Sequence, residues 1–178
     1  MNGLQIIQCI DEIPCLKQIF IGVYNNKTVP MTLKNIRNGF YIINTANNVN
    51  KMGHWVMYYV KDFTMYFFDS FGCSPSEYGL DIEKNYNLYP YKKHVVFNRE
   101  IQDESSYVCG LYTLYFAYLM CNNKTIEVIK KKFGKNRSKN DLFVINYINK
   151  LLGLRFTCKK VFCSSLMYSY KCRNYCVC

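Results

Sequence analysis

Short runs of apolar residues, rich in β-branched and aromatic side chains, alternate with polar segments through the first hundred residues. The length and composition of these runs are typical of β-strands. Loops separate them. One loop contains Pro30, and residues 73–86 have the character of a loop with a short helix. Strands are therefore predicted at 16–24, 39–46, 53–60, 64–72 and 91–101.

The pattern changes in the second half of the chain. Residues 110–121 are apolar on nearly every face, which is typical of a helix buried in the middle of a core. Residues 125–134 have one apolar and one basic face, and Gly134 is a plausible end for an amphipathic helix there. Two helices are therefore expected, the first of them central.

A third helix is predicted at 139–153, where apolar residues recur at helical spacing. Asn140 or Asp141 could cap its start, and Gly153 could end it. Strands come first and helices follow, with one helix in the centre. This order predicts an α+β fold in which a mixed or antiparallel sheet packs against helices.

The composition is that of one folded domain over residues 1–178, since half of the residues are hydrophobic. The net charge is +11, which favours polyanionic partners such as DNA, and residues 130–140 are the most basic stretch. A solvated helix face and loop is the alternative for this stretch.

The N-terminus has no signal-peptide pattern, and the longest apolar run is too short to span a bilayer. An intracellular protein without a membrane partner is expected.

Ten cysteines are present, and half of them lie in a C-terminal tail at about 158–178. Without a secretion signal, a disulfide framework is not expected. The tail has no Cys-x-x-Cys pair, so its spacing does not favour zinc and no metal site is predicted. Metal binding, disulfides and simple packing of thiols remain open for the tail.

Two of the predicted strands bring a histidine and a carboxylate together. A hairpin with a two-residue loop at Lys61-Asp62 would place His54 directly opposite Asp69, at a Cβ separation of roughly 4.5–5.5 Å. In that register the Asp69 carboxylate could hold the His54 imidazole in one tautomer. A four-residue loop would instead shift Asp69 to face Val56 and leave His54 on the diagonal. A half-exposed histidine beside a strand-end aspartate is the alternative.

Cys109 lies where the polar run "QDESSYV" meets the apolar helix. A thiol in the first turn of a helix has a lowered pKa, because it lies at the positive end of the dipole. Gln102 lies seven residues upstream and could donate to an oxyanion together with the backbone N–H of Cys109. Gly110 lets another chain approach closely. Taken alone, the position favours a small buried hydrophobe, because cysteine is among the most buried residue types.

In this order, "IFIGVY", "IINTA", "GHWVMYYV", "FFDSFG" and the element Gln102-x6-Cys109-Gly110 resemble the adenovirus-type cysteine proteases (adenain) and their relatives in Polinton/Maverick elements. The resemblance covers roughly residues 16–121 and implies a papain-like α+β fold. It further implies that Cys109 is the nucleophile, His54 the general base and acid, Asp69 the residue that orients His54, and Gln102 part of the oxyanion hole. Trp55 and Gly110 are then the substrate-binding candidates, with Trp55 bordering the groove.

The resemblance also implies a substrate class and a cellular compartment. Family members cut viral structural precursors at Gly-containing sites during virion maturation, in the virion and inside the host cell, with the nucleus as the expected compartment. The chemistry requires no cofactor. An activating peptide or DNA stays open, although "YKKHVV" lacks the cysteine that anchors the adenoviral activator peptide. The acid is Asp69 where adenoviral enzymes have Glu, so a protease for ubiquitin-like modifiers is an alternative. A basic nucleic-acid-binding scaffold on a protease fold is a second one.

Overall fold

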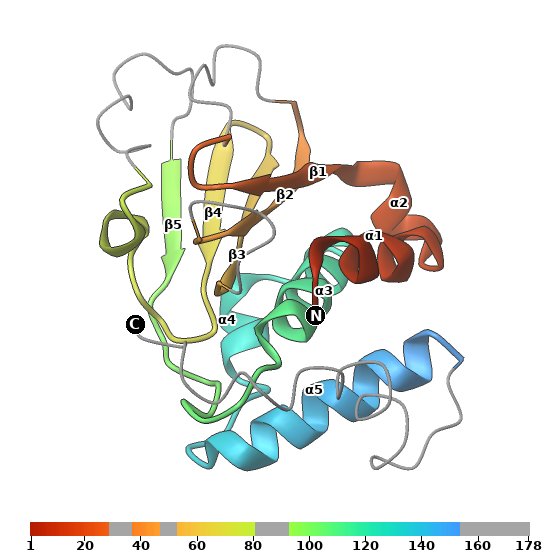
Figure 1. The fold of residues 1–178 in the computed structure, drawn as a ribbon, viewed down its shortest axis with the longest axis vertical. Helices are drawn as coiled ribbons and strands as arrows, with labels where there is room; N and C mark the ends of the chain where they lie inside the picture. Colours follow the sequence, from red (N-terminus) through yellow and green to blue (C-terminus); the bar gives the residue numbers. More distant parts are fainter. Residues whose placement is uncertain (29–36, 47–52, 81–92, 154–178) are drawn as a thin grey trace.

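A computed structural model describes residues 1–28, 37–46, 53–80 and 93–153 of the chain (Figure 1). It has a sheet of five strands with helices packed against it, which confirms the predicted α+β class. The elements are α1 (Gly3–Asp11), α2 (Pro14–Ile19), β1 (Phe20–Asn25), β2 (Gly39–Asn44), β3 (Trp55–Lys61), β4 (Thr64–Phe68), the 3₁₀ helix η2 (Pro75–Tyr78), β5 (Lys93–Phe97), α3 (Cys109–Cys121), α4 (Ile126–Lys130) and α5 (Arg137–Leu151).

The sheet is mixed, with its strands in the order β1-β2-β3-β4-β5. The two central pairs, β2 with β3 and β3 with β4, are antiparallel. The two outer pairs, β1 with β2 and β4 with β5, are parallel. The two outer strands therefore run alongside a meander of three, and the sequence had left this choice between mixed and antiparallel open.

The turn of the β3–β4 hairpin lies one residue further along the chain than predicted. Lys61 pairs with Thr64, so the two turn residues are Asp62 and Phe63. Both have positive φ, 47° and 59°, as the two central residues of a type I′ turn do. The predicted turn at Lys61-Asp62 was wrong, because the sequence carries no Gly or Asn that would mark where the left-handed residues fall.

This turn sets the register at the other end of the hairpin. Met57 pairs with Phe68, so Asp69 follows directly after the last paired residue of β4 and His54 directly precedes β3. His54 therefore lies diagonally across from Asp69, as in the alternative register. A hydrogen bond still joins the two side chains, because an imidazole and a carboxylate can span a diagonal between neighbouring strands.

Helix α3 is the centre of the core, as predicted. It packs against one face of the sheet and also contacts α1, α2 and α5. The Phe116 ring stacks on Phe68 of β4 with 4.2 Å between centroids. Aliphatic and aromatic side chains cover every face of the helix, which explains why no amphipathic pattern marks it. The buried residues of α3 are Gly110 to Ala117, Leu119 and Met120.

The N-terminal part of the chain differs from the prediction. Residues 16–24 were expected to be one strand, but α2 extends to Ile19 and only the second half is strand, because Pro14 begins a helical turn. Helix α1 precedes it and was not predicted. Asn2 caps α1 by accepting from the backbone of Gln5, whose side chain accepts from Asn2 in return.

The helix ends in the second half also differ in detail. Helix α4 stops at Lys130 and not at Gly134. Helix α5 begins with Asn136 as its cap, four residues before the predicted cap Asn140 and five before Asp141. Gly153 ends α5 as predicted, with a left-handed φ of 65°.

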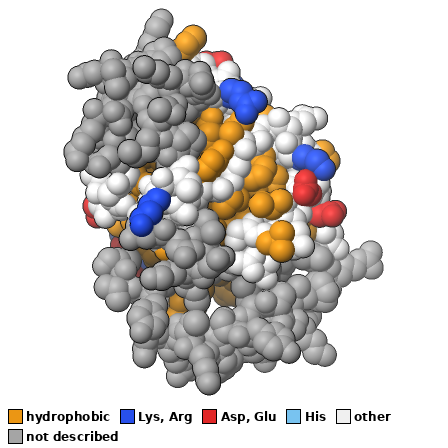
Figure 2. All heavy atoms as spheres, turned by 45° about the horizontal axis from the view of Figure 1, so that its top comes forward, with side chains coloured by type: hydrophobic (Ala, Val, Ile, Leu, Met, Phe, Trp, Pro, Cys, Tyr) orange, Lys and Arg blue, Asp and Glu red, His pale blue; other side chains and the backbone are white. Residues whose placement is uncertain are grey.

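The face of the molecule in Figure 2 shows hydrophobic side chains in a band, with lysine and arginine side chains at separate points around it. Within the described residues, none of the helices has the length and apolar character needed to cross a bilayer. The cysteine-rich tail, residues 158–178, lies outside the described residues.

Candidate active site

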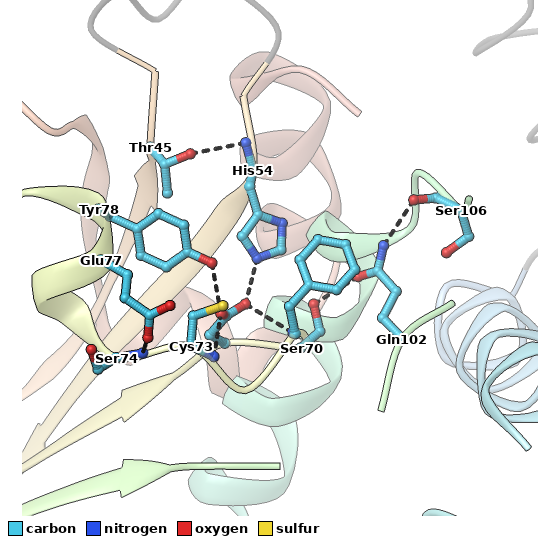
Figure 3. A network of polar contacts seen from close by, with 11 residues as sticks. Thr45, His54, Ser70, Cys73, Ser74, Glu77, Tyr78, Gln102 and Ser106 are labelled. Carbon is cyan, nitrogen blue, oxygen red and sulfur yellow. Dashed lines mark hydrogen bonds and ion pairs between the residues drawn. The ribbon is translucent and has the colours of Figure 1, made fainter. Parts of the chain in front are cut away.

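His54 is held by its backbone at the entrance to β3. Its N–H donates to the Thr45 hydroxyl at 3.1 Å, and its carbonyl accepts from the Thr45 N–H at 2.9 Å (Figure 3). The residue before it must be glycine, since a Cβ on Gly53 would lie 2.7 Å from the backbone nitrogen of Ala46. This explains physically why "GH" precedes the strand.

The His54 ring is held between aromatic and acidic neighbours. Phe71 stacks on it, with 4.5 Å between ring centroids and 27° between planes. Nε2 of the ring is hydrogen-bonded to Oδ1 of Asp69. Because this bond occupies Nε2, the other ring nitrogen, Nδ1, is left for the Cys109 thiol, which interacts with the His54 side chain.

Asp69 is fully buried and saturated with donors. Besides His54, the carboxylate accepts the backbone N–H of Phe71 at 3.0 Å, the N–H of Cys73 at 2.9 Å and the hydroxyl of Tyr78 at 2.7 Å. Four donors around one buried carboxylate stabilise its charged form. They also fix its orientation, and through it the orientation of the imidazole.

A tight turn after Asp69 makes this arrangement possible. Gly72 has φ of 77°, and its N–H donates to the Asp69 carbonyl at 3.2 Å. A Cβ on Gly72 would lie 2.7 Å from the backbone of both Arg99 and Glu100. The glycine of "FDSFG" is therefore required twice, for the left-handed turn and for the close approach of the next segment.

Cys109 is the first residue of α3, as predicted. Val108 at the N-cap offers no side-chain acceptor, so the positive end of the helix dipole is directed at the residues of the first turn. Burial acts to raise the pKa of Cys109, but the hydrogen bond and the charge of His54, with a backbone N–H at Trp55, outweigh it and lower the pKa. The thiol is therefore poised to ionise.

The pKa values of His54 and Asp69 also shift in the directions that favour their charged forms. Burial works against a charged His54, but hydrogen bonds with Asp69 and Cys109 raise its pKa to about 9. Burial likewise works against charge on Asp69, and His54, the Phe71 N–H and the Tyr78 hydroxyl together lower its pKa. The lowered pKa of Cys109, the raised pKa of His54 and the lowered pKa of Asp69 all favour the charged form of each group.

Gln102 is fully buried, and both ends of its amide are held. The Ser70 hydroxyl donates to Oε1 at 2.6 Å, and Nε2 donates to the carbonyl of Ser106 at 2.9 Å (Figure 3). An amide nitrogen has two hydrogens, so within the described part of the chain one N–H of Gln102 remains for another acceptor.

The loop that carries Gln102 is anchored to α5. The Asp103 carboxylate accepts from the Ser138 hydroxyl at 2.6 Å. The Tyr112 hydroxyl donates to the Asp141 carboxylate at 2.8 Å and to the Ile101 carbonyl at 3.0 Å. Helix α5 therefore fixes the loop that lies between Gln102 and Cys109.

Trp55 and Gly110, the two substrate-binding candidates, are both buried beside the N-terminal segment. Trp55 is 3% exposed, and its ring N–H donates to the Met1 carbonyl at 3.0 Å. Gly110 is buried, and a Cβ there would lie 3.3 Å from the Met1 sulfur. The segment that approaches Gly110 closely is the N-terminal one of this chain. In the described part of the chain, both residues pack against that N-terminal segment.

The structure thus brings His54, Asp69 and Cys109 together. Four supporting residues were not found from the sequence: Thr45, Ser70, Phe71 and Tyr78. "FFDSFG" includes two of them, but no spacing rule assigns roles to the residues between an acid and a glycine. Among the described residues, no group of three or more His, Cys, Asp or Glu side chains could hold a metal ion.

No known family's sequence model matches this chain, and no curated protein matches it either. Among solved structures, the ASFV pS273R protease is similar with a TM-score of 0.48 and 13% identity, over 84% of this chain and 66% of that one. Its selenomethionine form gives 0.40 and 15%, over 66% and 45%. The chain thus spans about two thirds of that protease or less. The functional argument below rests on the geometry of the site.

Proposed function

We propose that this protein is a cysteine endopeptidase with Cys109 as nucleophile, His54 as general base and acid, and Asp69 as the residue that orients His54. The observation that carries the proposal is the Cys109–His54–Asp69 line at the N-terminus of a buried helix. The other described thiols with a resolved shift behave differently. Burial raises the pKa of Cys9, and it raises that of Cys73 to about 11.

The proposed reaction is acyl transfer. The Cys109 thiolate attacks the carbonyl carbon of a peptide bond, and the negative charge moves to the carbonyl oxygen. The N–H of Cys109 and the remaining N–H of Gln102 would donate to that oxygen. His54 then gives its proton to the departing amine, which leaves a thioester on Cys109. Water, deprotonated by His54, attacks the thioester and releases the acid and the thiolate.

The decisive experiment compares thiols in one protein. Iodoacetamide at about pH 6.5 should alkylate Cys109 far faster than free cysteine, because the thiolate is already formed. Cys109→Ala should lose about 10⁴-fold or more in peptide hydrolysis while remaining folded. Cys73→Ala, which removes a nearby thiol of raised pKa, is the matched control and should keep most activity. Hydrolysis that survives in Cys109→Ala would disprove the assignment.

For substrates, we propose viral structural precursors cut at Gly-containing sites during virion maturation, in the virion and the host cell interior. Support comes from the sequence resemblance alone. Peptides with Gly-Gly before the scissile bond should be cleaved and their Ala-Ala counterparts left intact. Turnover of ubiquitin- or SUMO-derived fluorogenic substrates, with none of the Gly-Gly peptides, would favour the deconjugating alternative.

DNA is proposed as a partner on the ground of charge. Lys131, Lys132 and Lys135 are exposed in the basic stretch 130–140, and the net charge is +11. Duplex DNA should bind with an affinity that falls steeply with salt. Gln at these three positions should weaken binding, and Gln at the exposed Lys17 and Lys27 should change it little.

DNA binding by a chain whose Cys109 reacts only as fast as free cysteine would support the scaffold alternative instead. Adding duplex DNA or a candidate activating peptide to the peptide-hydrolysis assay tests whether either one stimulates the enzyme.

A further inference from the structure

Two partly buried thiols meet at the end of α3 that lies away from Cys109. The Cys121 S–H donates to the backbone carbonyl of Cys15 at 3.1 Å. Cys15 belongs to α2 and Cys121 is the last residue of α3, so this contact joins elements that are 106 residues apart along the chain. The nucleophile candidate and this pair therefore occupy opposite ends of one buried helix.

The side chains of the pair also meet each other. The Cys15 side chain also lies close enough to the Cys121 thiol to raise its pKa, and both thiols pack against the outside of the main core while staying partly exposed. A disulfide needs Cβ atoms about 3.5–4.5 Å apart. A Cys121 sulfur that touches the Cys15 backbone from the adjacent helix is close to that arrangement, and the partial exposure of both thiols admits a small oxidant.

We propose that Cys15 and Cys121 are a reversible disulfide pair, oxidised by exchange with a small-molecule disulfide such as oxidised glutathione. This site is independent of the proposed peptidase activity.

The exchange proceeds in two steps. Burial raises the pKa of Cys121 to about 12, so Cys121 is scarcely ionised and the first attack falls to Cys15. The Cys15 thiolate attacks one sulfur of oxidised glutathione, breaks its S–S bond and releases one glutathione thiolate. Cys121 then loses its proton, attacks the Cys15 sulfur and displaces the second glutathione. The protein gives up two electrons and two protons, and oxidised glutathione becomes two reduced molecules.

The bridge would fasten α2 to the far end of α3 without disturbing Cys109. Helix α3 has 13 residues, so its two ends are about 18 Å apart. A bridge that closes so long a loop restricts the unfolded chain strongly, and an increase in Tm of about 5–10 °C is expected. The fold would gain stability in an oxidising environment while the nucleophile stays free.

Tryptic mapping can identify the bridge without ambiguity in a suitable variant. Trypsin releases residues 1–17, with Cys9 and Cys15, and residues 100–124, with Cys109 and Cys121. In the double variant Cys9→Ser, Cys109→Ala each peptide keeps one cysteine. After incubation with oxidised glutathione, mass spectrometry should find these two peptides joined, and reduction should separate them. In the unsubstituted chain, cleavage before Asp11 separates Cys9 from Cys15 and provides a second measurement should the variant fold poorly.

Cys121→Ser should abolish both the joined peptide and the increase in Tm, whereas Cys9→Ser alone should keep both. Cys9 is a fair control because it is also a partly buried thiol on the neighbouring α1. The proposal is overturned if Cys15 accumulates as a mixed disulfide with glutathione, if both thiols stay reduced, or if Cys15 or Cys121 is joined to a cysteine of the tail instead.

Discussion

Ser70 donates a hydrogen bond of 2.6 Å to Oε1 of Gln102, and both side chains are fully buried. Ser70 directly follows Asp69, and its carbonyl accepts from the Gln102 N–H at 3.1 Å. One short segment thus holds both the acid that orients His54 and the amide proposed for the oxyanion hole. This arrangement couples two parts of the site that lie over thirty residues apart in sequence.

Ser70→Ala should therefore reduce turnover by acting through Gln102. Without the hydroxyl, Oε1 loses its donor and the amide can rotate, so its N–H is no longer aimed at the oxyanion. We expect kcat to fall about 10-fold, less than the 10²–10³-fold typical for removing an oxyanion donor, with KM little changed. Steady-state kinetics on a cleavable peptide measure both.

A double-mutant cycle separates this role from a general loss of packing. In a Gln102→Ala background, Ser70→Ala should have little further effect on kcat, since the residue through which it acts is gone. Ser76→Ala, at an exposed serine of η2, is the control for substitution itself. Equal and additive losses in both backgrounds would show that Ser70 does not work through Gln102.

The pH profile of kcat/KM should be bell-shaped with a broad plateau. Cys109 has a lowered pKa, so the reactive thiolate forms at a lower pH than that of an ordinary thiol and is lost as acid protonates it. His54 has its pKa raised to about 9, so the imidazolium that protonates the leaving amine is present below about pH 9 and is lost above it. Activity should therefore fall as the pH rises past about 9. Because Cys109 and His54 titrate together, each limb of the profile reports the pair and not one residue alone.

The measurement is kcat/KM from about pH 4 to about pH 10, with iodoacetamide reactivity of Cys109 over the same range. An ascending limb near the ordinary thiol pKa of about 8.5, with reactivity like that of free cysteine, would contradict the ion pair.

The predictability of this fold from sequence depends on whether a signal is local. The buried helix that starts at Cys109 and the strands of the β3–β4 hairpin carry strong apolar patterns, and both were found. The contact between His54 and Asp69 was also predicted, although the preferred hairpin register was wrong. The contact forms in the observed register because the two side chains reach each other along the diagonal.

Other features had a signal that was overlooked. Helix α1 has Ile6 and Ile10 one turn apart, and Asn2 with Gln5 three residues later has the spacing of a capping box. By contrast, the hydrogen bond from Tyr78 to Asp69 depends on how the turn after Asp69 folds back. No periodicity in one sequence records such a contact.

Tyr78→Phe should weaken the support of Asp69. The Tyr78 hydroxyl donates to Oδ2 of Asp69 at 2.7 Å and helps to lower the pKa of this carboxyl group. Without it the pKa of Asp69 should rise, so protonation at low pH breaks the His54 contact earlier and the acid limb of the profile moves to higher pH. We expect a loss of about 2- to 10-fold on the plateau and about 1 kcal/mol of unfolding free energy.

The same kinetics and a urea unfolding curve test this variant, with Tyr66→Phe on the hairpin as the matched tyrosine control. Should the acid limb stay in place while stability falls, Tyr78 would support the fold and not the charge of Asp69.

Phe63→Gly should stabilise the protein, which is unusual for removing a large side chain. Phe63 has φ of 59° in the hairpin turn and is 57% exposed. A non-glycine residue in this left-handed region costs roughly 1–2 kcal/mol, and Asp-Gly is a favoured pair for a type I′ turn. We expect the free energy of unfolding to rise by about 1 kcal/mol in urea denaturation.

Thr64→Gly, one residue later in β4, is the control and should lower the free energy of unfolding, because glycine weakens a paired strand position. If both substitutions destabilise the protein equally, the turn is not strained at Phe63.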